Sequence, residues 1–181
     1  MSVIESTKQF APAGSWTADP VHSSVSFEVA YAGIGTFRGG FRDFTAELDG
    51  SSLTGTATVA SVDVKDENLN GHLLSPDFFD AERHPEIAFR ADALTRDEDG
   101  TVEGSGEITI KGVTRPVELT GRIGPSNVDP FGREKLGLTL ETEVDRNEFG
   151  VSWNAPNQGG GDYLGSEVKL VAELVLVKPE A

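Results

Sequence analysis

Residues 101–123 read TVEGSGEITIKGVTRPVELTGRI and contain two alternating runs on either side of a turn. In each run every second residue is apolar or glycine, and the residues between are polar or charged. The repeated positions are Val102, Gly104, Gly106, Ile108 and Ile110, followed by Val117, Leu119, Gly121 and Ile123. A period of two is typical of strands with one buried face, so this stretch predicts two long antiparallel strands. The glycines within them suit the bending that a closing sheet requires.

The same period extends over most of the chain. It predicts further strands over residues 21–31, 44–48, 53–59, 87–93, 136–144 and 168–177. Ser23 is a polar exception on the apolar face of the first of these strands. The last strand is apolar on both faces, because Val171, Val175 and Val177 interleave with Leu170, Leu174 and Leu176. One of its faces must meet something other than water, so a homodimer contact through the valines is possible.

Turn signals, and no long helical patterns, separate these eight strands. Short connections imply antiparallel neighbours, and closing the sheet on itself removes exposed edges. We therefore expect an all-β fold, an eight-stranded antiparallel up-and-down barrel with a short helix over one end. A two-sheet sandwich is the alternative.

The helix is expected where the alternation stops, in residues 68–80. Ser75 is a favourable N-cap and Pro76 a favourable first helical residue, which predicts a short helix over residues 76–80. Phe78 and Phe79 give this segment two large apolar groups to bury. It is either a plug that closes the barrel or a lid whose rings also contact a ligand.

Composition excludes several classes of function. The chain has 181 residues, with 30 aspartates and glutamates against 15 lysines and arginines, and its net charge is −15. Such a charge disfavours binding to nucleic acids and to anionic lipid surfaces. The absence of cysteine rules out disulfides and thiolate chemistry. The three histidines lack chelating spacing, so we expect no metal and no cofactor.

The chain reads as one domain over residues 15–178, preceded by a flexible leader over residues 1–14. The N-terminus has no basic region followed by a long apolar stretch, so no signal peptide is predicted. No apolar run approaches the about 18 residues of a membrane span. We therefore expect a cytoplasmic protein without stable membrane insertion.

Few residues suggest catalysis. His22 and His84 fit structural roles, whereas His72 is the histidine most suited to face a cavity. An enzyme acting on a hydrophobic substrate, a hydrolase or an isomerase, would need an acid–base pair, and His72 with Asp77 is the candidate. The glycine-rich residues 33–40 have no helix after them, so they are interpreted as a hairpin turn rather than a phosphate-binding loop.

The sequence points more strongly to ligand binding, because the predicted interior of the barrel is apolar and includes small residues. An eight-stranded barrel either fills with side chains or holds one small ligand. Small inward-facing residues favour the second outcome; they are Ala91, Ala93, Gly104, Gly106 and Gly121. An apolar chain bound there would gain about 0.8 kcal/mol per buried CH₂ group. A fully packed barrel that acts through a partner protein remains the third possibility.

Four segments, in order along the chain, resemble the motifs of the YceI-like family. They are residues 16–27, residues 70–80 running on to 84–89, residues 106–117 and residues 145–150. The resemblance implies a lipocalin-like barrel that holds a polyisoprenoid or another long-chain amphiphile and has no catalytic residues. Family members usually carry an Arg-Asp pair where this chain has Asn70-Gly71, and often a basic residue where it has Leu74.

These arguments predict a protein that binds, stores or carries a long-chain isoprenoid-type lipid. Strand parity gives the expected tail contacts: Phe27, Val29, Phe89, Ile108, Ile110, Leu138, Leu140 and Leu170. The residues expected at the mouth are His72, Phe78, Phe79, Phe149 and Trp153.

Overall fold

The computed structural model describes residues 9–179, and their strands form one sheet. In chain order the elements are β1 (Ser15–Ala18), β2 (Ser24–Tyr31), β3 (Gly35–Phe41), β4 (Phe44–Asp49), β5 (Ser52–Thr58), the 3-10 helix η1 (Val59–Ser61), β6 (Val62–Asp63), α1 (Glu67–Leu74), β7 (Glu86–Ala91), β8 (Thr95–Arg96), β9 (Thr101–Ile110), β10 (Val113–Ile123), β11 (Asn127–Val128), β12 (Glu134–Asp145), the 3-10 helix η2 (Arg146–Phe149) and β13 (Leu164–Val177). Every strand pairing is antiparallel.

The sheet closes into a barrel. Pairing runs from β4 through β5, β7, β9, β10 and β12 to β13, and β13 pairs with β1, which returns to β4. This ring has eight strands, and each long strand lies beside its neighbour in sequence. The predicted eight-stranded up-and-down barrel is therefore confirmed, and the sandwich is not.

Two strands of the barrel are interrupted. β1 and β2 both pair with β13, at successive positions along it. On their other side, β1 pairs with β4 and β2 pairs with β3. The predicted strand over residues 21–31 therefore begins only at Ser24, because residues 19–23 bulge away from β13. Ser23 lies in this bulge, where its hydroxyl oxygen accepts a hydrogen bond of 2.9 Å from the Val175 amide.

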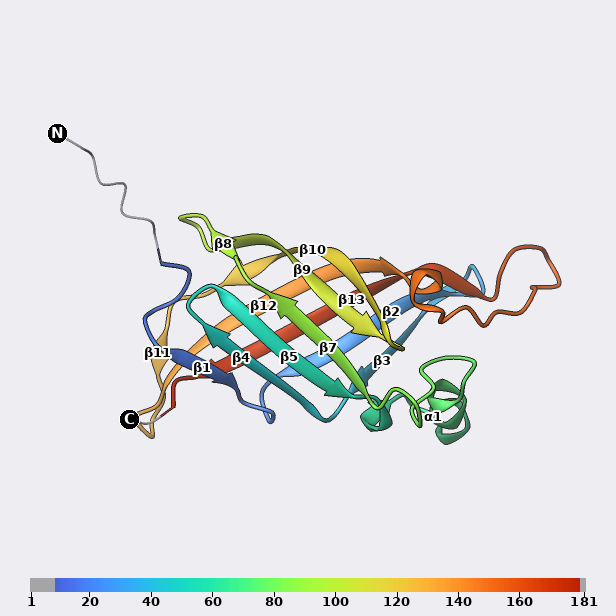
Figure 1. Cartoon of the computed structure of the whole chain (residues 1–181), viewed down its shortest axis with the longest axis horizontal. Helices are drawn as coiled ribbons and strands as arrows, with labels where there is room; N and C mark the ends of the chain where they lie inside the picture. The colour runs from blue at the N-terminus through green and yellow to red at the C-terminus, as the bar shows by residue number, and fades with distance from the viewer. Residues whose placement is uncertain (1–8, 180–181) are drawn as a thin grey trace.

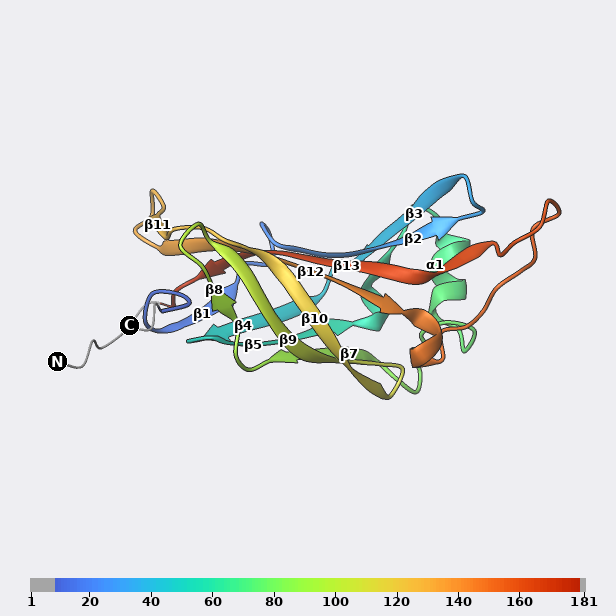
Figure 2. The ribbon, with the colours of Figure 1, turned by 90° about the horizontal axis from the view of Figure 1, so that it is seen from above.

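The two ends of the barrel differ. β1 and β11 lie at one end, and α1 and the loop before β13 lie at the other (Figure 1). Figure 2 shows β2 and β3 diverging from β9 and β10 towards the end that carries α1. We call the first the packed end, because four large side chains there have no exposed surface: Trp16, Leu48, Leu138 and Leu176.

A short helix does lie over one end, but the predicted boundaries are wrong. α1 spans Glu67–Leu74, and the Asp66 side chain caps it by accepting a hydrogen bond from the Leu69 amide. Ser75 lies at the C-terminal end of α1, not at the start of a helix. Its hydroxyl donates to the His72 carbonyl, and the chain then folds back so that the Phe79 amide donates to the carbonyl of Leu73. Residues 76–79 therefore form turns, and no helix spans the predicted range 76–80.

The glycine-rich residues 33–40 were expected to be a turn, but the turn covers only Ala32–Ile34, and β3 begins at Gly35. Close packing around Gly39 explains why β3 contains glycine. A Cβ atom on Gly39 would lie 2.5 Å from the Phe27 ring and 2.7 Å from a methyl group of Val64. Glycine is needed here because neighbouring side chains pack directly over the backbone.

The predicted leader lies only partly within the described residues, since residues 1–8 fall outside them. In the described part, Phe10 and Ala11 are buried against the core of the barrel. The three valines of β13, Val171, Val175 and Val177, are half-buried within the single chain. A homodimer through them stays a prediction.

Candidate functional site

A cavity of about 390 Å³ occupies the half of the barrel towards α1. Its wall consists mainly of aliphatic and aromatic side chains from the inner faces of the strands, with α1 and the segments after α1 and η2 at the end. Tyr31 belongs to this wall and is 37% exposed, so the wall meets the surface of the protein at this residue. We call the end of the barrel that carries α1 the cavity end.

Twelve of the thirteen predicted site residues line the cavity: Phe27, Val29, His72, Phe78, Phe79, Phe89, Ile108, Ile110, Leu140, Phe149, Trp153 and Leu170. Leu138 is the exception. It faces inward as parity predicts and is fully buried, but it lies nearer the packed end, paired with Ile123 and Leu174. Alternation along a strand reports which face a residue occupies and carries no information on its depth in the barrel.

The small residues expected to face inward do not create the space, contrary to the sequence argument, and Ala93 is exposed beyond the end of β7. Ala91, Ala93 and the glycines of β9 and β10 lie outside the cavity wall. A Cβ atom on Gly121 would lie 1.8 Å from the Thr139 carbonyl oxygen, and one on Gly106 would lie 2.5 Å from that of Arg90. These glycines allow neighbouring strands to approach closely, so they tighten the barrel.

The sequence argument missed part of the wall. Phe37 and Phe41 line the cavity from β3, within or next to the stretch interpreted as a turn. Phe27 packs between their rings, with centroids 6.0 Å and 5.9 Å away. The spacing of Phe37 and Phe41, an even number of residues apart, is the signal that the glycines obscured.

Aromatic rings form a continuous chain across the cavity end. The His72 ring packs edge-on against Phe78 and Trp153, with centroids 4.9 Å and 4.8 Å away. Trp153 also contacts Tyr163, whose ring meets that of Tyr31 at 4.9 Å. We call these five residues the mouth. They come from β2, α1 and the segments that follow α1 and η2.

The mouth also carries hydrogen-bonding groups. His72 Nε2 is 3.0 Å from Asp77 Oδ2, and the Tyr163 hydroxyl donates to the Tyr31 hydroxyl at 3.0 Å. The second contact raises the pKa of Tyr163, because the hydrogen bond with Tyr31 favours the neutral phenol. The mouth therefore combines flat apolar rings with polar groups, an arrangement typical of a boundary between an apolar interior and water.

Arg146 is a buried cation in the cavity wall, and four of its five N–H donors bond to backbone carbonyls. Its guanidinium donates to four carbonyls, those of Val151, Trp153, Leu164 and Gly165, at 2.7–3.3 Å. Burial lowers the pKa of Arg146 from its ordinary value, whereas Asp145 and Asp162 oppose that shift. Arg146 therefore fixes the loop that carries Trp153 instead of presenting a free charge to a ligand.

No cluster of three metal-ligating side chains is found within residues 9–179. In the same part of the chain, no helix is both long enough and apolar enough to span a bilayer.

Comparisons with known proteins agree with this architecture. The YceI-like domain matches residues 16–176. A UPF0312 protein of Staphylococcus epidermidis is 30% identical over 162 residues, which cover 85% of this chain and 92% of the relative. A UPF0312 protein of Pseudomonas putida is 29% identical over 137 residues, which cover 72% and 71% of the two chains.

Two solved structures share the fold. The Burkholderia cenocepacia protein BcnA superposes with a TM-score of 0.75 at 22% identity, covering 90% of this chain and 99% of that one. A domain from Saccharophagus degradans, described as a polyisoprenoid binding domain, gives a TM-score of 0.70 at 11% identity over 91% and 98% of the two chains.

Proposed function

The chain belongs to the YceI-like family, and on that premise we propose that it binds a polyisoprenoid or another long-chain amphiphile and does not transform it. The observation that carries this proposal is the apolar cavity of about 390 Å³ at one end of a closed barrel. Its volume falls within the range of about 300–1,000 Å³ that is usual for small-molecule sites. The structural neighbour from Saccharophagus degradans, described as a polyisoprenoid binding domain, supports the same class of ligand.

In this proposal the apolar tail fills the cavity and the head lies at the mouth. Each CH₂ group transferred from water contributes about 0.8 kcal/mol, so a tail of a few isoprene units offsets the entropy lost on binding. Tail contacts come from the strands, including Phe27, Ile108 and Leu170, and the head contacts His72 and the tyrosine pair. The protein then acts as a carrier or a reservoir for the lipid.

Extraction of the purified protein with organic solvent, followed by mass spectrometry, tests the proposal. We expect about one lipid per chain, or saturable uptake of an added C20 prenol by the emptied protein. Recovery of no lipid together with no uptake would contradict it.

The variant Ile108→Arg tests the location of the tail. Ile108 is buried in the cavity wall, and a guanidinium there would be desolvated without a partner, so we expect uptake of the prenol to be lost. The matched control is Ser105→Arg, which adds the same charge to the exposed outer face of β9 and should bind as the wild type does. Because Ile108→Arg could also impair folding, Ala172→Phe serves as a second variant that fills the cavity with an apolar group.

The His72–Asp77 contact favours a second candidate function, an enzyme that hydrolyses or isomerises a hydrophobic substrate. A carboxylate 3.0 Å from an imidazole in the cavity wall is the arrangement that general acid–base catalysis uses. Incubation with a prenyl ester distinguishes the two functions. Turnover that is lost in His72→Ala would support the enzyme, whereas recovery of intact ester bound to the protein would support the carrier.

A further inference from the structure

Lys111 joins two parts of the cavity end that are far apart in the sequence. It lies in the turn between β9 and β10, and its Nζ donates to the Pro76 carbonyl at 2.7 Å and to the Gly150 carbonyl at 3.1 Å. Pro76 follows α1, and Gly150 follows η2. The side chain of Lys111 therefore connects three of the four segments that carry the sequence motifs.

The backbone of Lys111 adopts a conformation that lysine rarely adopts. Ile110 pairs with Val113, so Lys111 and Gly112 form a two-residue hairpin loop, and their φ angles are +52° and +77°. Loops of this type favour asparagine or aspartate followed by glycine, because both central residues need positive φ. Because lysine is unfavourable at this φ angle, its presence suggests that the side chain has a role elsewhere in the structure.

The segments that Lys111 joins also carry rings of the cavity wall. Phe78 follows Pro76 by two residues, and Phe149 and Trp153 flank Gly150. Phe78 and Trp153 meet across the mouth with ring centroids 5.5 Å apart. Separating the two segments would part these rings and widen the entrance, and the two hydrogen bonds of Lys111 oppose that movement.

We infer that Lys111 is a positioning residue that keeps the mouth narrow and thereby sets the rate at which a bound amphiphile leaves. This inference rests on the proposed function. It concerns the exchange of the ligand, whereas the cavity wall determines which ligand is bound. Lys111 itself lies outside the wall, so its removal leaves the contacts with the tail unchanged.

The variant Lys111→Asn separates the role in the mouth from a role in stability. Asparagine fits the positive φ at this position, so the turn keeps or gains stability, while the ammonium group is lost. The protein is loaded with a C20 prenol and mixed with phosphatidylcholine vesicles, and release of the prenol is followed over time. We expect release to be about tenfold faster than in the wild type, which corresponds to about 1.4 kcal/mol. The melting temperature should be unchanged or higher.

Two further variants sharpen the result. Lys65→Asn removes the same charge from an exposed site just before α1, and it should release the prenol at the wild-type rate. Lys111→Arg keeps a cationic donor and should restore most of the slow release.

The outcomes separate this inference from the proposed function. Stoichiometric binding with equal release rates for the wild type and Lys111→Asn would overturn the inference and leave the proposed function standing. Faster release accompanied by a lower melting temperature would assign Lys111 to stability alone and would also overturn it. A wild-type protein that takes up no prenol would overturn the proposed function itself.

Discussion

A single serine interrupts the apolar face of the first long strand. In the sequence Ser23 breaks the alternation, and in the structure it lies where residues 19–23 bulge away from β13. Its hydroxyl accepts from the Val175 amide, and the Asp19 amide donates to the Val175 carbonyl at 2.8 Å. Both backbone groups of Val175 are therefore satisfied although neither β1 nor β2 pairs with this residue. The alternation of apolar residues identifies Ser23 as an exception, but only the pairing of β1 and β2 with β13 explains why a serine lies there.

The variant Ser23→Ala should lower the stability of the fold. Without the hydroxyl, the half-buried Val175 amide loses its acceptor, so we expect the free energy of unfolding to fall by about 1–3 kcal/mol. Urea denaturation measures the change. The neighbouring exposed Ser24→Ala is the control and should differ from the wild type by less than about 0.5 kcal/mol. Equal effects of the two substitutions would show that the hydroxyl of Ser23 does not stabilise the bulge.

At the level of elements, the sequence predicted the strands well and their interruptions poorly. Alternation located the long strands because one face of each is buried and the other meets water. The strand β3 was missed and interpreted as a turn, because Gly39 and Gly40 lack the side chains that mark a strand. The helix was misplaced because Asp66 and Ser75 are both good caps, and only the return of the chain towards α1 selects the first.

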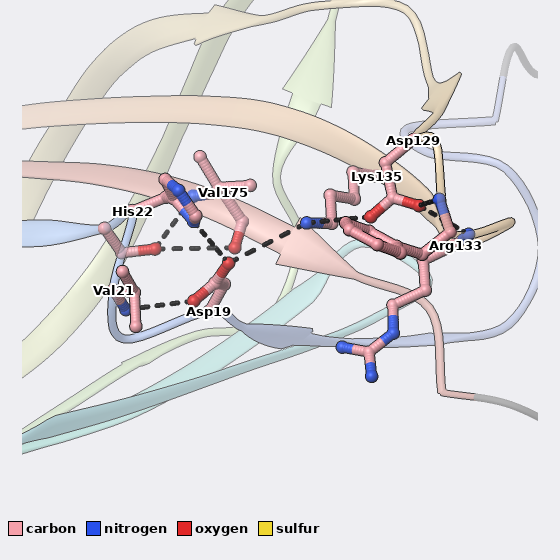
Figure 3. A network of polar contacts seen from close by, with 9 residues as sticks. Asp19, Val21, His22, Asp129, Arg133, Lys135 and Val175 are labelled. Atoms are coloured by element: carbon pink, nitrogen blue, oxygen red, sulfur yellow. Dashed lines mark hydrogen bonds and ion pairs between the residues drawn. The ribbon is translucent and has the colours of Figure 1, made fainter.

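The turn between β1 and β2 is held to the hairpin of β11 and β12 by charged groups (Figure 3). His22 Nδ1 lies 2.7 Å from Asp19 Oδ2, and Lys135 Nζ lies 3.9 Å from that oxygen and 3.1 Å from Asp129 Oδ2. Contact with His22 and then with the Val21 amide lowers the pKa of Asp19. Backbone amides, that of Arg133 first, and Lys135 lower the pKa of Asp129. The network therefore connects two turns at the packed end.

The Asp19 carboxylate should make stability depend on pH in acid. Because its pKa is lower in the folded chain than in the unfolded one, its contribution is present above the unfolded value of about 3.9 and is lost as the pH falls through the folded pKa. Asp19→Asn should therefore be less stable than the wild type at pH 7, and the difference should shrink below about pH 4. Urea denaturation at pH values from 7 to 3 measures both. A difference that stays constant over this range would contradict the role given to Asp19.

Over the whole molecule, the barrel combines a solid half with a hollow half. The sequence predicted the inner faces correctly, and twelve of the thirteen expected site residues line the cavity. It could not predict where along the barrel the space lies. Depth depends on how the strands diverge, and divergence depends on long-range pairing that no local pattern encodes (Figure 2). The small residues were misleading for that reason, since they mark close approach between strands instead of empty volume.

The two halves should respond differently to the same truncation. Leu138 and Leu140 lie two residues apart on the inner face of β12, but Leu138 is fully buried in the solid half and Leu140 borders the cavity. Leu138→Ala should cost about 3–5 kcal/mol of unfolding free energy, because the neighbouring side chains cannot collapse into the space left behind. Leu140→Ala should cost about 2 kcal/mol or less, because part of its surface already faces empty space. For prenol binding the order should reverse: Leu140→Ala changes the affinity, and Leu138→Ala leaves it as in the wild type. Urea denaturation and prenol titration of both variants test this, and equal losses of stability would mean that the barrel is uniformly packed along its axis.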